Sequence, residues 1–227
     1  MSMPFYVAPE QVMKDRADYA RKGIARGRSL IGATFADGIL LCAENPSRML
    51  RKISEIYDRI AFAGVGKYNE FDQLRISGVR HADLKGYSFS REDVDARSLA
   101  NQYAQILGQI FTHEMKPLEV EILVAEVGTV VDDDQLFHIQ YDGTLVDERD
   151  FTVLGGEAES IRDRMRAAYS AESDLGAALK VSVSALAGPE RTLGAGEIEA
   201  ALLDRTGVRR RFRRLENDEI AALLETA

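Results

Sequence analysis

The fold of this chain is decided by residues 9–38, which read PEQVMKDRADYARKGIARGRSLIGATFADG. Pro9 suits the first turn of a helix, where its missing N–H costs no hydrogen bond. Apolar residues follow on one helical face at Val12, Met13, Ala17, Ala20 and Ile24. Gly27 ends that helix, and Ser29–Phe35 then forms an apolar strand that turns at Asp37-Gly38. The stretch therefore predicts an amphipathic helix, a bend and the first strand of a hairpin.

The remainder of the chain predicts short strands in hairpins, separated by pairs of helices. A capping pattern at Ser90–Asp93 precedes the clearest helix, which stops before Pro117. The predicted strands are 29–35, 39–43, 53–56, 59–65, 120–127, 135–141, 151–154, 198–203 and 210–215, and the later helices are 67–83, 99–111, 157–169, 174–186 and 218–224. Strand meanders separated by helix pairs argue for α+β layers rather than alternating βαβ units.

We expect a single domain, 1–227, in which two sheets pack on each other and helices cover both outer faces. A chain of 227 residues is long enough to bury a sizeable core, and no linker divides it. Segment 1–8 has no helical periodicity. It precedes the helix and bend of residues 9–27, and residues 28–227 form the layered body.

Composition and charge exclude several classes of protein. Hydrophobic residues make up 45% of the chain and charged residues 29%, as in ordinary soluble domains. The net charge of −8 argues against nucleic-acid binding by bulk electrostatics. Cys42 is the only cysteine, which excludes an internal disulfide and favours a cytoplasmic location. We expect no signal peptide and no membrane partner, because the sequence carries neither pattern.

Local patterns that suggest cofactors or catalysis fail on their details. Ala61–Tyr68 lacks the first Gly and the Ser/Thr after Lys67 that a phosphate loop needs, so a strand-to-helix corner is favoured. The histidines lack metal-ligand spacing, and neither a GxSxG elbow nor a recognisable Cys–His pair is present. We therefore expect no cofactor and no metal. The histidines are His81, His113 and His138.

One basic cluster, Arg209–Arg214, permits two interpretations. It could form a phosphate or nucleic-acid patch. Alternatively, it is a solvated strand whose arginines pair with nearby acids (Glu216, Asp218 and Glu219) or lie at a subunit contact. The acidic net charge favours the second interpretation.

A set of longer motifs runs through nearly the whole chain. They are PFYV (4–7), PEQ (9–11), DYARKGI (18–24), ADGILL (36–41), AENPS (43–47), KISEIYDR (52–59), GKYNEFD (66–72), YDG (141–143), GG (155–156) and FRR (212–214). With these motifs the chain resembles proteasome α-subunits, specifically those of the actinobacterial type. The motifs from 36 to 72 are long and specific.

The resemblance implies a four-layer αββα sandwich of the N-terminal-nucleophile hydrolase type, with an extra N-terminal helix. The family's catalytic β-subunits expose an N-terminal threonine at the start of the first strand, where its hydroxyl attacks the substrate and its free amine is the base. Here that place falls near Arg28–Ser29, carries no threonine and has a helix ahead of it. The resemblance therefore implies a non-catalytic subunit of a threonine endopeptidase complex.

The resemblance also implies a mechanical role and a set of partners. A homo-heptameric α ring would cap each end of a β-subunit double ring in an α7β7β7α7 barrel and support ATP-dependent degradation of tagged protein substrates. The helix from Pro9 would lie on the outer surface of the ring. The first residues would gate the axial pore; these are Met1, Ser2, Met3, Pro4, Phe5, Tyr6, Val7 and Ala8.

A pocket between neighbouring α-subunits is implied to receive the C-terminal tail of a ring-shaped ATPase activator. Lys52 would pair with the terminal carboxylate of the tail, and Gly66 would let the tail backbone approach because it has no Cβ. Asp18, Tyr19 and Gly27 match the helix and bend that respond to the tail. Asp18 stands where many relatives carry the longer Glu.

Two other classes of function stay open at this point. A self-processed hydrolase of the same fold would expose Ser29 as an N-terminal serine, which an intact-mass measurement would detect. A nucleic-acid-binding module that used Arg209–Arg214 would show steep salt dependence.

The missing threonine and blocked amine at Arg28–Ser29 predict that the chain alone hydrolyses no peptides. The check is turnover of fluorogenic peptides by the purified chain and by its mixture with the β-subunit. Only the mixture should be active. Turnover by the chain alone that survives Ser29→Ala would contradict its non-catalytic assignment.

Overall fold

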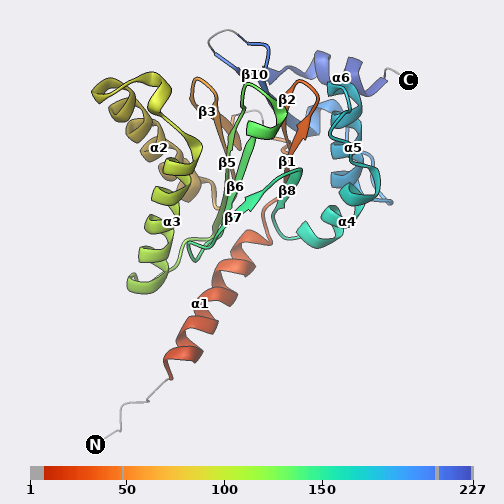
Figure 1. Cartoon of the computed structure of the whole chain (residues 1–227). Coiled ribbons are helices and arrows are strands. Elements are labelled where there is room, and N and C mark those ends of the chain that lie inside the picture. The colour runs from red at the N-terminus through yellow and green to blue at the C-terminus, as the bar shows by residue number, and fades with distance from the viewer. Residues whose placement is uncertain (1–7, 48, 208–209, 226–227) are drawn as a thin grey trace, which may run out of the picture.

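The computed structural model describes residues 8–47, 49–207 and 210–225, which form four layers (Figure 1). Two helices cover one outer face and three cover the other, with two sheets between them. This confirms the expected αββα sandwich. The helices are α1 (Pro9–Ile24), α2 (Tyr68–Ser88), α3 (Ala96–His113), α4 (Ala158–Ala168), α5 (Leu175–Ala187) and α6 (Asn217–Glu225).

Each sheet has five strands, and all strand pairs are antiparallel. The strand orders are β10-β9-β2-β1-β8 and β3-β4-β5-β6-β7. The chain thus contributes its N-terminal hairpin and its last two strands to the same sheet. The strands are β1 (Leu30–Phe35), β2 (Gly38–Glu44), β3 (Ile53–Tyr57), β4 (Ile60–Gly66), β5 (Val120–Glu126), β6 (Gln135–Ile139), β7 (Leu145–Glu148), β8 (Phe151–Leu154), β9 (Ile198–Asp204) and β10 (Phe212–Leu215).

Successive side chains point to opposite faces of a strand. In the central strands the side chains on both faces are buried. In β2, Leu41 packs between the two sheets, while Leu40 and Cys42 pack under the helices of the outer layer. Burial raises the pKa of the Cys42 thiol to about 12. The described helices include none that is both long and apolar enough to cross a membrane.

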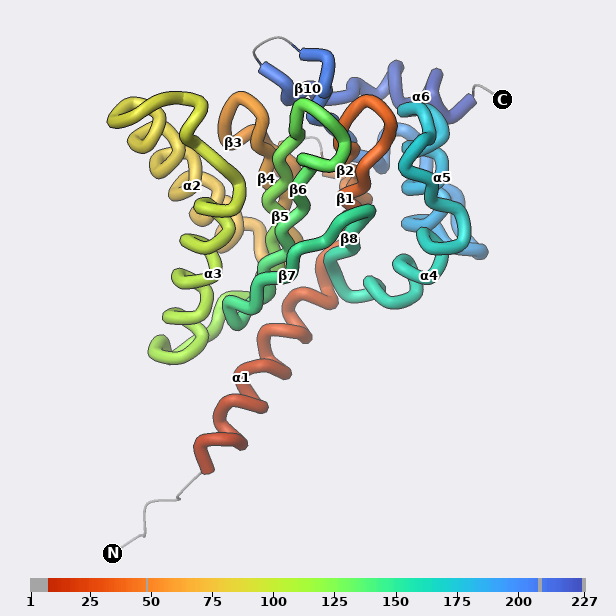
Figure 2. The backbone as a smooth tube through the Cα atoms, in the orientation of Figure 1, coloured from red at the N-terminus to blue at the C-terminus, as the bar shows by residue number. Residues whose placement is uncertain are grey.

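Helix α1 projects from one end of the sandwich (Figure 2). It starts at Pro9, as predicted, and the carbonyl of Ala8 accepts hydrogen bonds from its first turn. Its buried residues are Ala20 and Ile24, which join the core between the sheets. The helix is therefore anchored at its C-terminal end, next to β1.

One local prediction was wrong, and one strand was missed. Helix α3 begins at Ala96, where the Asp95 carboxylate accepts a hydrogen bond from the Ser98 N–H at 2.7 Å. Ser90 instead caps a single 3-10 turn, because the buried Val94 separates that turn from the helix. Strand β7 was not predicted, since it is a partly exposed edge strand with polar residues and no apolar run.

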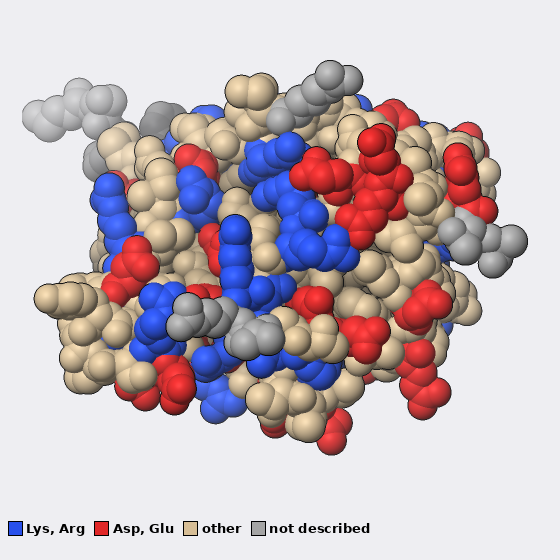
Figure 3. Space-filling model, turned by 90° about the horizontal axis from the view of Figure 1, so that it is seen from above, with Lys and Arg blue, Asp and Glu red and all other residues tan. Residues whose placement is uncertain are grey.

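Three described arginines of the basic cluster pair with carboxylates, of which Glu219 is one of the predicted partners, whereas Arg211 donates to the backbone carbonyls of Gly128 and Arg205. Arg213 donates to Glu219 at 2.7 Å and Arg214 donates to Glu199 at 2.6 Å. Arg210 is paired with Glu55, and Arg209 lies outside the described residues. The face seen from above mixes basic and acidic side chains (Figure 3). These pairings favour a solvated, charge-compensated strand over a nucleic-acid patch.

Candidate functional site

Lys52 directly precedes β3 and forms the centre of a polar site near the end of α1. Its Nζ donates a hydrogen bond to the backbone carbonyl of Arg28 at 2.5 Å. Burial lowers the pKa of the Lys52 amine to about 8, and the carboxylates of Glu199 and Glu44 partly offset that effect. The side chain is thus a partly desolvated cation, held against the segment that joins α1 to β1.

Glu44, at the end of β2, is buried and carries two arginine partners. The Arg28 guanidinium forms an ion pair with its carboxylate. Arg191 donates to both carboxylate oxygens, at 3.1 and 3.3 Å. The two arginines balance the negative charge of Glu44, so Glu44 is not the main counter-charge of Lys52.

Gly27 and Gly66 bring the bend after α1 against the end of β4. A Cβ on Gly27 would lie 3.0 Å from the backbone nitrogen of Gly66. Gly66 has a φ of +105°, and a Cβ there would overlap the carbonyl oxygen of Glu119. The backbone of Lys52 joins the same region, since its carbonyl accepts the Gly64 N–H at 3.0 Å. Lys52, Gly27 and Gly66 therefore form one site.

Tyr19 connects to this site through charged residues. The Lys116 Nζ lies 5.5 Å from the centre of the Tyr19 ring. Lys116 pairs with Glu70 at 2.8 Å and with Glu119 at 3.1 Å, and the Glu119 carbonyl accepts the Lys67 N–H. Tyr19 thus reaches the residues that flank Gly66.

Asp18 does not share these contacts. Its ion pair in the described structure is with Arg21 on the same helix, at 3.7 Å, and both side chains are exposed. Of the predicted gate, Met1–Val7 lie outside the described residues.

The place where catalytic relatives carry a nucleophile is closed here. Ser29 is buried, and its carbonyl accepts the Glu44 N–H at 3.2 Å. A Cβ on Gly155 would lie 2.8 Å from the Ser29 hydroxyl oxygen. The serine is therefore packed inside the chain, with α1 ahead of it.

The residues that the sequence did not single out are Arg28, Glu44, Arg191 and Glu199. The available signal was a glutamate in each of two otherwise apolar strands, at the end of β2 and inside β9. A charge in such a run must find a buried partner. Those partners could not be identified from the sequence, because they lie far along the chain. Chemically, the site offers a partly desolvated lysine cation, which suits recognition of a carboxylate.

Comparisons with known proteins identify the family of the chain. A family model described as "Proteasome subunit" matches residues 24–201. The chain is 65% identical to the proteasome subunit alpha of Acidimicrobium ferrooxidans, over 99% of this chain and 97% of the relative. It is 57% identical to that of Sanguibacter keddieii, over 99% and 90%, and 54% identical to that of Thermobifida fusca, over 100% and 92%.

The backbone at Gly66 predicts a costly substitution. Gly66→Ala should lower the free energy of unfolding by about 1–3 kcal/mol, because it strains a positive-φ position and meets the Glu119 carbonyl. Urea unfolding of the purified chain measures this. Gly196→Ala is the matched control, since a Cβ added at that position would meet no atom within 4 Å. Equal unfolding midpoints for the two variants would contradict the strain at Gly66.

Proposed function

This chain belongs to the proteasome subunit family as an α subunit, a non-catalytic ring component of the core particle. On that premise we propose that it gates substrate entry and docks an activator beside Lys52. The relatives' α-subunit assignment extends over nearly the full length of both chains. The ring assembles with β-subunits, which carry the threonine protease activity.

The observation that carries the docking proposal is the contact between the Lys52 Nζ and the Arg28 carbonyl. A C-terminal carboxylate that approached Lys52 would receive a charge-assisted hydrogen bond from a cation already partly out of water. The missing Cβ of Gly66 serves this chain's own packing, because the Glu119 carbonyl occupies that direction, so the part of Gly66 in docking rests on the family resemblance. The family resemblance implies that this carboxylate is a chain terminus.

The same contact connects docking to helix α1. Arg28 follows the bend at Gly27, and α1 is anchored through Ala20 and Ile24. A carboxylate that took the Lys52 hydrogen bond away from Arg28 would act on the point where α1 joins the body. Tyr19, through Lys116 and the residues flanking Gly66, supports the same connection. The family resemblance alone suggests a role for Asp18, because the ion pair that Asp18 forms in the described structure is with Arg21 and not with the residues around Lys52.

We also propose how the subunit is arranged in the whole particle and which partners the particle has. We place the chain in a homo-heptameric ring, in an α7β7β7α7 barrel located in the cytoplasm. The activator is a ring-shaped ATPase that presents its C-terminal tails, and the substrates are tagged proteins. Segment 1–8 is the gate. The alternative of a self-processed hydrolase gains no support, because Ser29 is buried behind α1.

Deleting residues 1–8 should open the gate and leave assembly intact, because the deletion spares helix α1, which starts at Pro9 and is anchored in the core. Peptide hydrolysis by the assembled particle should rise, and unfolded casein should gain more than tetrapeptides. Native mass or electron microscopy confirms that the particle size is normal. Unchanged rates for both substrates in such particles would refute the gate.

Lys52→Ala should weaken binding of activator-tail peptides roughly 10- to 150-fold, since a hydrogen bond to a charged group contributes about 1.5–3 kcal/mol. Lys52→Arg should restore binding only partly, because a planar guanidinium replaces a compact ammonium. Wild-type affinity should fall as the pH rises through the Lys52 pKa of about 8, because the amine then loses its charge.

Tail binding to assembled particles, measured by fluorescence polarisation from pH 6 to 9, tests these expectations. Lys85→Ala is the control, because it removes a lysine paired with Asp95 on the outer helices. Equal affinities for wild type, Lys52→Ala and Lys85→Ala would make Lys52 an ordinary surface lysine.

A further inference from the structure

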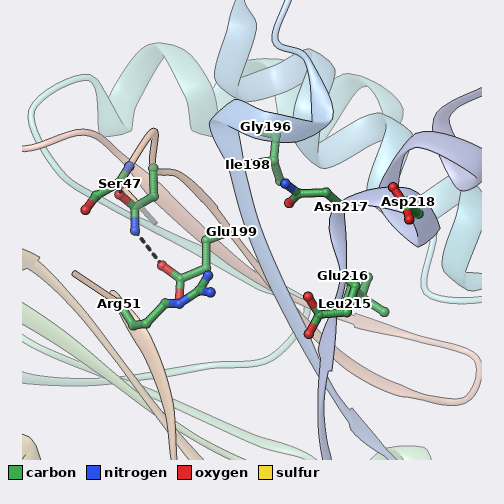
Figure 4. A pocket seen from close by; sticks show the side chains of 10 residues that line it. Ser47, Arg51, Gly196, Ile198, Glu199, Leu215, Glu216, Asn217 and Asp218 are labelled. Atoms are coloured by element: carbon green, nitrogen blue, oxygen red, sulfur yellow. Dashed lines mark hydrogen bonds between the residues drawn. The ribbon is translucent and has the colours of Figure 1, made fainter. Parts of the chain in front are cut away.

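Glu199 is a buried charged residue near the start of strand β9. It lies in β9, whose sequence is IEAALLD, and it is 2% exposed. Its carboxylate points toward the segment that follows β2, where the Asn45 amide donates to it at 2.7 Å (Figure 4). A buried carboxylate is costly unless it is paired and hydrogen-bonded. The groups that donate to Glu199 therefore show how its charge is stabilised.

The remaining donors to Glu199 come from β3 and β10. The backbone N–H of Lys52 donates to it at 2.9 Å and that of Ile53 at 3.2 Å. Arg214 donates to the same carboxylate at 2.6 Å and to the Ile53 carbonyl at 2.7 Å. One carboxylate thus fixes the start of β3, where Lys52 is located, to two strands of the opposite sheet.

Glu199 also dominates the charges that face Lys52. These are the carboxylates of Glu199 from β9 and Glu44 from β2, and the guanidinium of Arg28 before β1. Arg28 and Arg191 already compensate Glu44. Glu199 is the strongest of the charges that raise the pKa of Lys52 against the effect of burial.

We propose that Glu199 is a positioning residue of the Lys52 site: from β9 it fixes the backbone at Lys52 and Ile53 and keeps the Lys52 ammonium charged. The inference rests on the proposed function only in taking Lys52 as the group that binds a tail. Its electrostatic part concerns Lys52 alone and can be measured without an activator.

The first experiment measures the pKa of Lys52 in assembled particles, by competitive acetylation at a series of pH values and mass spectrometry of the Lys52 peptide. Glu199→Gln should lower this pKa by about one unit, because a neutral amide replaces the carboxylate. Glu126→Gln is the matched control, since Glu126 is also buried and bonded to an arginine and a backbone N–H, but in the other sheet. It should leave the pKa of Lys52 unchanged.

A second variant guards against a folding failure. If Glu199→Gln does not assemble, Glu199→Gln combined with Arg214→Met removes both charges of the pair together, which is far less destabilising than leaving one buried charge unpaired. The pKa of Lys52 should fall in this variant too. An unchanged Lys52 pKa in either assembled variant would overturn the role of Glu199.

The second experiment compares tail-peptide binding at two pH values. It distinguishes a loss of charge on Lys52 from a general loss of structure. With a Lys52 pKa lowered from about 8 to about 7, the charged share at pH 7.5 falls roughly threefold, while at pH 6 nearly all of it stays charged. Glu199→Gln should therefore bind the tail peptide about threefold more weakly at pH 7.5 and as well as wild type at pH 6. Equal weakening at both pH values would overturn the control of the Lys52 charge by Glu199. Failure of wild type to bind the peptide would refute the docking function, and the acetylation result would then decide the role of Glu199.

Discussion

Burial of both faces of the central strands is the constraint on which the rest of the structure depends. Each sheet packs against the other on one side and against helices on the other, so a charged residue on a central strand cannot reach water by turning outward. Glu44, Glu126 and Glu199 are all buried, and each is bonded to at least one arginine. Each of the three carboxylates lies at or next to the end of its strand, where an arginine side chain reaches it.

The Lys52 site is a direct product of that arrangement. It forms where the ends of β2, β3 and β9 meet the segment between α1 and β1. The Lys52 backbone is bonded to Glu199 of β9, and the Lys52 side chain is bonded to Arg28, which follows the bend at Gly27. Lys52 therefore lies between fixed strands and a segment that is joined to one anchored helix.

Much of the fold could be read from local patterns, because the apolar strands and amphipathic helices show their periodicity over short windows. The N-terminal helix was found from Pro9 and its apolar spacing, and the first hairpin from Asp37-Gly38. Strand β7 escaped because an exposed edge strand needs no apolar run. For the site, Lys52, Gly27 and Gly66 were indicated by family resemblance, whereas Glu199 was missed. Its donors lie near residues 45, 52 and 214, and no local window contains them together.

That separation along the chain has a consequence for biosynthesis. Glu199 accepts from Ile53 across 146 positions in the sequence, and the Arg214 guanidinium closes the cluster from β10. The chain emerges from the ribosome N-terminal end first, so Lys52 is made long before the strands that hold it in place. A nascent or C-terminally truncated subunit that stops before β10 carries the lysine without its completed surroundings. Completion of the last strand is therefore the step at which a newly made subunit acquires this site.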